Sequence, residues 1–131
     1  MPKAKVMVVD DDSRYLELLD FMLSASDFEV IAESNPKLVQ ARAEETQPDV
    51  IVLDMAMPEQ DGIAVGMSLK SSAETKQIPI IYVTAMSGSA DMREAKNIGA
   101  VRYLTKPFSP MELIDTLKQI LADRQAERAK A

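Results

Sequence analysis

The chain has 131 residues, of which 47% are hydrophobic and 27% charged, with a formal net charge of −6 and neither cysteine nor histidine. This length suits one domain around a single hydrophobic core. Without cysteine there are no disulfides or thiolate metal sites, and without histidine the usual general base and the commonest transition-metal ligand are missing. A bound metal should therefore be a hard cation held by oxygen atoms, such as Mg²⁺.

Charge and hydropathy also argue against two classes of partner. The negative net charge disfavours direct nucleic-acid binding, because contacts to phosphates require a basic surface. No apolar run approaches the roughly 18 residues of a membrane span, and no long apolar segment follows the N-terminus as in a signal peptide. We therefore expect a cytoplasmic protein that binds neither nucleic acid nor membranes.

Alternating strand and helix signals extend along the chain. Short apolar runs predict strands at 5–9, 28–32, 49–54, 78–84 and 101–104. Helical spacing of apolar residues predicts helices at 13–23, 35–45, 63–69, 87–98 and 109–121. This series predicts an α/β fold, a parallel sheet with right-handed crossovers and helices on both faces. Residues 1–122 should form this domain, and 123–131 a polar helical tail or linker stub.

Three of the predicted helices carry capping signals at their start. Ser13 is expected to cap the first helix, and Asn35 followed by proline to start the second. Ser109 and Glu112 form a capping box for the last helix, with proline at its first position.

Polar side chains gather where the predicted strands end: Asp10, Asp11 and Asp12 after the first, Asp54 at the third, Thr84 at the fourth and Lys106 after the fifth. In sheets of this class the site lies beyond the carboxyl ends of the strands. Crowded carboxylates raise one another's pKa unless a cation joins them, so the acids predict an Mg²⁺ site. An aspartate can attack phosphorus, and a fixed lysine would neutralise charge on the transferring phosphoryl group. Asp54 is therefore predicted to be a phosphorylated nucleophile.

Each of these residues alone has a plainer structural interpretation. The acidic triplet could be a solvated loop and helix cap, and Asp54 a capping or turn residue. Thr84 could be an ordinary strand residue and Lys106 a surface charge. No single one of these residues indicates a reactive site. The site is favoured because the acids, Thr84 and Lys106 occur together and in this order along the chain.

In these motifs the chain resembles a receiver domain of two-component response regulators, in the same broad group as single-domain chemotaxis regulators. The resemblance rests on Val8-Val9-Asp10-Asp11, Leu53-Asp54 with Met57-Pro58 and Asp61-Gly62, Val83-Thr84-Ala85, and Lys106-Pro107-Phe108. It covers about residues 5–121 and implies a flavodoxin-like (βα)5 fold. The expected sheet is doubly wound and five-stranded, with strand order 2-1-3-4-5.

The resemblance also implies roles for individual residues. Asp54 would be the phosphoacceptor, and Thr84 and Lys106 would contact the phosphoryl group. Thr84 and Tyr103 would be the switch residues. The metal, Mg²⁺ with Mn²⁺ as an alternative, would be held by Asp10, Asp11, Asp54 and the backbone carbonyl of Ala56. Similar proteins lose the phosphoryl group at rates that depend on the positions of Ala56 and Met86, and these two apolar residues imply a long-lived phosphoryl state.

The implied partners are a histidine kinase or phosphotransfer protein as phosphoryl donor and an output protein or domain. The output would be controlled through the surface of the fourth helix, fifth strand and fifth helix, and a homodimer could form on phosphorylation. Such a domain is regulatory and not an enzyme, although it catalyses its own phosphoryl transfer and slow dephosphorylation.

Two other functions fit parts of the pattern. A haloacid-dehalogenase-like phosphatase would use Asp10 as nucleophile, but Ser13-Arg14 supplies no threonine where that motif needs one, and the chain leaves no room for a cap domain. A receiver-like scaffold would bind partners without phosphorylation, which the full set of acids, Thr84 and Lys106 makes a weaker interpretation.

Overall fold

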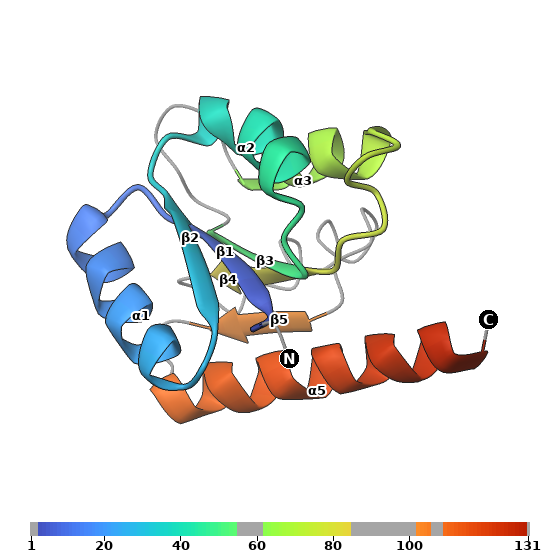
Figure 1. The fold of residues 1–131 in the computed structure, drawn as a ribbon. Coiled ribbons are helices and arrows are strands. Elements are labelled where there is room, and N and C mark those ends of the chain that lie inside the picture. Colours follow the sequence, from blue (N-terminus) through green and yellow to red (C-terminus); the bar gives the residue numbers. More distant parts are fainter. Residues whose placement is uncertain (1–2, 55–61, 85–101, 106–108, 131) are drawn as a thin grey trace.

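A computed structural model of the chain describes residues 3–54, 62–84, 102–105 and 109–130 (Figure 1). The sheet contains five strands: β1 (Lys5–Val9), β2 (Glu29–Glu33), β3 (Val50–Asp54), β4 (Ile80–Thr84) and β5 (Arg102–Thr105). All neighbours are parallel, and the order is β2-β1-β3-β4-β5. The predicted α/β class and the strand order 2-1-3-4-5 are therefore confirmed.

The described helices are α1 (Ser13–Ala25), α2 (Val39–Thr46), α3 (Gly62–Ser71) and α5 (Pro110–Lys130), with a short 3-10 turn (Pro36–Leu38) before α2. The helix predicted at 87–98 lies outside the described residues. In Figure 1, α1 and α5 lie on one side of the sheet and α2 and α3 on the other. In the part of the chain that the structure describes, no helix is long and apolar enough to cross a membrane.

Side chains alternate between two core clusters along each central strand, as the two-residue period of a strand requires. In β3, Val50 and Val52 pack with apolar residues of α1 and α5, whereas Ile51 and Leu53 pack with those of α2 and α3. All four side chains are buried. The run of apolar residues in β3 is therefore explained by a strand covered on both faces.

The start of α1 differs from the prediction by one residue. Asp12, and not Ser13, is the N-cap, because Asp12 Oδ1 accepts hydrogen bonds from the backbone N–H groups of Arg14 (3.0 Å) and Tyr15 (3.3 Å). At the last helix the predicted cap is confirmed, since the Glu112 N–H donates to Ser109 Oγ at 3.1 Å. Both caps satisfy N–H groups that a helix start leaves without partners.

The polar end of α5 is held against the start of β3. The apolar positions of α5 face the sheet as far as Ile120, which is buried. Four residues later, Arg124 Nη1 donates a 2.6 Å hydrogen bond to the backbone carbonyl of Asp49. The Asp49 carboxylate in turn accepts from the Lys5 N–H at 2.8 Å. The helix therefore stays connected to the sheet beyond its last buried hydrophobic residue.

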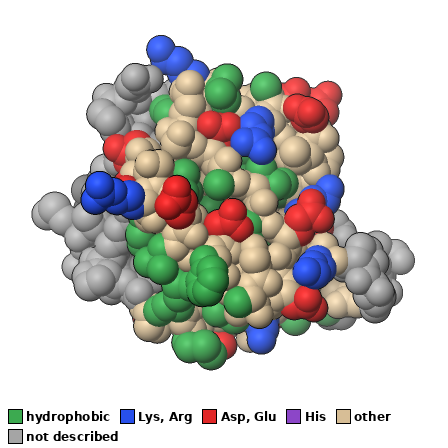
Figure 2. Space-filling model, turned by 60° about the vertical axis from the view of Figure 1, so that its left-hand side comes forward, with side chains coloured by type: hydrophobic (Ala, Val, Ile, Leu, Met, Phe, Trp, Pro, Cys, Tyr) green, Lys and Arg blue, Asp and Glu red, His purple; other side chains and the backbone are tan. Residues whose placement is uncertain are grey.

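Some large apolar side chains lie outside the core. Figure 2 shows hydrophobic side chains gathered on the side of the molecule that α1 occupies. Phe21 of α1 is 75% exposed, and Met111 near the start of α5 is 61% exposed. These two side chains lie on the solvent-facing sides of helices that bury other apolar side chains in the core.

We predict that Leu117→Ala lowers the free energy of unfolding by about 2–5 kcal/mol, because the substitution leaves a cavity beneath α5. Leu117 is fully buried in the cluster shared by α1 and α5. Met111→Ala, on the exposed face of the same helix, should change the free energy by no more than about 0.5 kcal/mol. Urea denaturation of both variants measures this, and equal losses would contradict the described packing.

Candidate functional site

Asp10 and Asp54 occupy the ends of two neighbouring strands. β1 and β3 pair in parallel with Val9 opposite Leu53, so the next residues of the two strands lie side by side. The Asp10 N–H extends the ladder by donating to the Glu33 carbonyl at 3.3 Å. Both side chains are buried, with Asp10 3% and Asp54 7% exposed. Two carboxylates are thus fixed at one edge of the sheet by backbone pairing.

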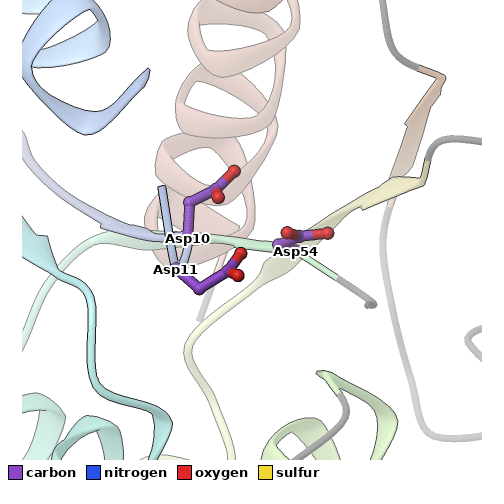
Figure 3. A group of neighbouring side chains, drawn as sticks. All are labelled: Asp10, Asp11 and Asp54. Atoms are coloured by element: carbon purple, nitrogen blue, oxygen red, sulfur yellow. The ribbon is translucent and has the colours of Figure 1, made fainter. Parts of the chain in front are cut away.

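Asp11 completes a group of three carboxylates. One oxygen atom from each of Asp10, Asp11 and Asp54 lies within 4.8 Å of the others. Figure 3 shows the three side chains close together, with Asp10 and Asp11 from the end of β1 and Asp54 from β3. Asp11 is exposed, whereas the other two carboxylates are buried. This all-oxygen set fits a hard divalent cation, which also requires waters or carbonyls in its other positions.

The acidic triplet divides into two roles. The Asp12 N–H donates to Asp10 Oδ1 at 3.0 Å, which orients the first carboxylate of the triplet. Asp12 itself caps α1. The plain interpretation as a helix cap is therefore right for the third acid, while Asp10 and Asp11 join Asp54.

Glu33 supports the site from β2 and was not singled out from the sequence. Its buried carboxylate accepts hydrogen bonds from Arg42 Nη1 at 3.2 Å and from the Asn35 N–H at 3.0 Å. These partners compensate the charge of Glu33, while its carbonyl receives the Asp10 N–H. In the sequence, the support that Glu33 gives to Asp10 was indicated only by an acid near the end of a predicted strand, two residues before Asn35-Pro36.

Tyr15 is a second residue near the acids, and the sequence analysis predicted only that it lies in the helix at 13–23. Burial, and then the negative charges of Asp10 and Asp54, together raise the pKa of the Tyr15 phenol to about 12. The phenol is therefore neutral at physiological pH and keeps its donor proton close to the carboxylates. A hydroxyl in the first turn after an acidic triplet was the available sequence signal.

For two other predicted site residues, Thr84 and Tyr103, the structure describes the backbone only. In the strand register Asp54 lies opposite Val83, so Thr84 ends the neighbouring strand one residue further on. Tyr103 lies in β5, opposite Tyr82 of β4. The side chains of Thr84 and Tyr103 are not among the described parts of the structure.

Three other positions from the sequence predictions, namely Ala56, Met86 and Lys106, lie outside the described residues altogether. The structure therefore brings together Asp10, Asp11 and Asp54 and places the backbone of Thr84 at the adjacent strand end.

Comparison with known proteins identifies the family of the chain. Residues 6–118 match the family model of the response regulator receiver domain. The chain belongs to this family. It is therefore a receiver domain, a phosphorylation-dependent signalling switch of two-component systems, and a regulatory unit.

Individual relatives differ in length. The chain is 35% identical over 123 residues to the polar-differentiation response regulator DivK of Brucella anthropi, covering 94% of this chain and 99% of that protein. It is 38% identical over 117 residues to the transcriptional regulatory protein PhoP of Bacillus subtilis, covering 89% of this chain and 48% of PhoP. The chemotaxis protein CheY4 of Vibrio cholerae superposes with a TM-score of 0.86 at 29% identity, covering 90% of this chain and 98% of that one. The chain thus spans about half the length of some curated relatives and nearly all of others.

We predict that Asp10→Asn lowers the pKa of Tyr15 towards its ordinary value of 10.0, because one of the negative charges that raise it is removed. NMR of tyrosine labelled at Cζ, followed through alkaline pH, measures this directly. Asp20→Asn is the matched control, since it removes a carboxylate from the exposed face of α1 and should leave the pKa of Tyr15 unchanged.

The sign of the stability effect follows from the same shift. The folded-state pKa of about 12 exceeds the unfolded value of 10.0, so the contribution to stability is complete below pH 10 and is lost as the pH rises towards 12. Equal Tyr15 titrations in wild-type protein and Asp10→Asn would contradict the placement of the phenol beside Asp10.

Proposed function

We propose that Asp54 is the phosphoacceptor and that it takes its phosphoryl group from a phosphohistidine of a histidine kinase or phosphotransfer protein. The observation that carries this proposal is the group formed by buried Asp54 with Asp10 and Asp11 at the carboxyl edge of the sheet. A carboxylate oxygen of Asp54 attacks phosphorus, the new P–O bond forms as the P–N bond breaks, and the leaving imidazole takes up a proton from solvent.

Asp10, Asp11, Asp54 and the carbonyl of Ala56 would hold Mg²⁺, or Mn²⁺ in its place. The cation, when bound, neutralises the carboxylates and the charge on the transferring phosphoryl group. Asp10 is already oriented for this by the Asp12 N–H at 3.0 Å. Thr84 and Lys106 complete the proposed site as donors to phosphoryl oxygens.

The phosphoryl group then shifts the population of two conformations. Moving such an equilibrium from mostly off to mostly on takes about 3–5 kcal/mol of differential binding. One or two charge-assisted hydrogen bonds from Thr84 and Lys106, at about 1.5–3 kcal/mol each, are of that size. Tyr103 relays the change to the surface formed by residues 87–98, β5 and α5. An output protein or domain, or a second copy of the chain, binds this changed surface. We place this activity in the cytoplasm and assign residues 1–122 to the receiver, with 123–131 as a helical tail or linker.

Asp54→Asn is expected to abolish Mg²⁺-dependent labelling by a small phosphodonor, because an amide cannot form the acyl phosphate. Radiolabel transfer from acetyl phosphate, or intact mass after treatment with phosphoramidate, measures the modification. Asp20→Asn should label as well as the wild type. Labelling of Asp54→Asn at the wild-type level would refute the assignment.

Two results would instead support the other functions considered from the sequence. Turnover of a generic phosphatase substrate that is lost in Asp10→Asn and kept in Asp54→Asn would favour a phosphatase. Failure of the wild type to bind Mg²⁺ or beryllofluoride would favour a scaffold that acts without phosphorylation.

We further expect a long-lived phosphoryl group, with a half-life of minutes or more without a phosphatase. Neither Ala56 nor Met86 has a side chain that can position a hydrolytic water by hydrogen bonding. The decay of isolated phosphorylated protein in Mg²⁺ buffer measures the half-life, and Ala56→Asn should shorten it. A wild-type half-life of only seconds would contradict this expectation.

A further inference from the structure

Asp10 and Asp54 belong to the face of the sheet that α1 covers. In β1, Val6 and Val8 pack in the cluster shared with α1 and α5, and Asp10 continues their alternation. In β3, Val50 and Val52 pack in that same cluster, and Asp54 is the next residue in the series. The alternation therefore directs both carboxylates towards the layer that begins with α1.

Tyr15 enters the same region from the first turn of α1. Its backbone N–H donates to the Asp12 cap at 3.3 Å, and the Asp12 N–H donates to Asp10 Oδ1 at 3.0 Å. Two hydrogen bonds thus tie the start of the helix to the first carboxylate of the site. The Tyr15 side chain is partly buried and packs on the cluster of α1 and α5, so the ring is confined.

Tyr15 packs on the same layer towards which Asp10 and Asp54 are directed, and the charges of both acids act on its phenol. A neutral phenol is a donor that adds no positive charge to compete with a cation. A phosphoryl group on Asp54 would bring new acceptor oxygens and more negative charge into this region, and both would strengthen a hydrogen bond from the phenol.

We propose that Tyr15 is a positioning residue of the phosphoacceptor site, whose hydroxyl donates a hydrogen bond to the phosphoryl group carried by Asp54. This proposal rests on the function proposed above. Thr84 ends β4, on the side of β3 away from β1, whereas Tyr15 approaches from α1. The phosphoryl group is thereby held from two directions, and the hydroxyl of Tyr15 favours the phosphorylated state over the free one.

Tyr15→Phe tests this directly, since it removes the hydroxyl and keeps the ring. We expect the affinity for beryllofluoride in the presence of Mg²⁺, and the maximal rate of phosphorylation by phosphoramidate, each to fall roughly three- to tenfold, the effect of one hydrogen bond. The affinity for Mg²⁺ alone should change less than twofold. Ser24→Ala is the matched control, because it removes a hydroxyl that donates to the Asp20 carboxylate on the exposed face of α1 (2.9 Å) and should change none of these values.

A second variant separates the hydroxyl from the ring. If only ring packing matters, Tyr15→Phe should keep the wild-type beryllofluoride affinity and phosphorylation rate, and Tyr15→Leu should lower both. That result would overturn the proposal. If the hydroxyl matters, both variants should lose the same phosphoryl-dependent affinity, even where urea denaturation shows that Tyr15→Phe is as stable as the wild type.

Different results would contradict the proposed function and the role of Tyr15. Wild-type protein that neither labels nor binds beryllofluoride would contradict the proposed function, and the role of Tyr15 with it. Normal wild-type labelling that Tyr15→Phe retains in full, with unchanged beryllofluoride affinity, would overturn the role of Tyr15 alone.

Discussion

Repulsion between three neighbouring carboxylates is the constraint to which the rest of this structure is adapted. Asp10, Asp11 and Asp54 each place an oxygen within 4.8 Å of the others, and two of the three side chains are buried. Like charges this close repel one another, so side chains free to move would separate. Backbone pairing of β1 with β3 prevents the separation, because moving either acid would break a ladder that is buried on both faces. The fold therefore holds the three carboxylates together in spite of their mutual repulsion.

The strand that carries Asp54 is tied to its neighbours at its start and buried along its length. At its start, Asp49 accepts hydrogen bonds from Arg124 of α5 through its carbonyl and from the Lys5 N–H through its carboxylate. All residues from Val50 to Asp54 are buried. A strand so packed transmits strain and does not absorb it, so the phosphoryl charge proposed for Asp54 would be accommodated by groups around the strand end.

Much of this architecture could be predicted from the sequence because it depends on local patterns. The strands follow from short apolar runs, and the cap of α5 follows from Ser109 and Glu112. The strand order came from the family resemblance, since periodicity does not specify which strands become neighbours. The acids at the carboxyl edge could be predicted because parallel strands end on the same side.

The failures of prediction arise where distant segments decide local structure. Asp12 and Ser13 are both good N-caps, and the choice of Asp12 accompanies the bond from its N–H to Asp10. Tyr15 fits the apolar spacing of α1, and only the folded chain places its phenol near a carboxylate on β3. Glu33 ends β2 because it pairs with Val9 of β1 and its carbonyl accepts the Asp10 N–H.

The alternation that builds the two core clusters also assigns the reactive groups to one layer. Asp10 and Asp54 continue the strand positions that face α1 and α5, and these two helices contact each other. α5 is one continuous helix from Pro110 to Lys130, and its far end is tied to the beginning of β3 by Arg124. Charge added at one end of β3 thus acts beside a helical layer that is anchored at the other end of the same strand. The position of Asp54 in the two-residue period, and not only its place at a strand end, directs its side chain towards the layer of α1 and α5.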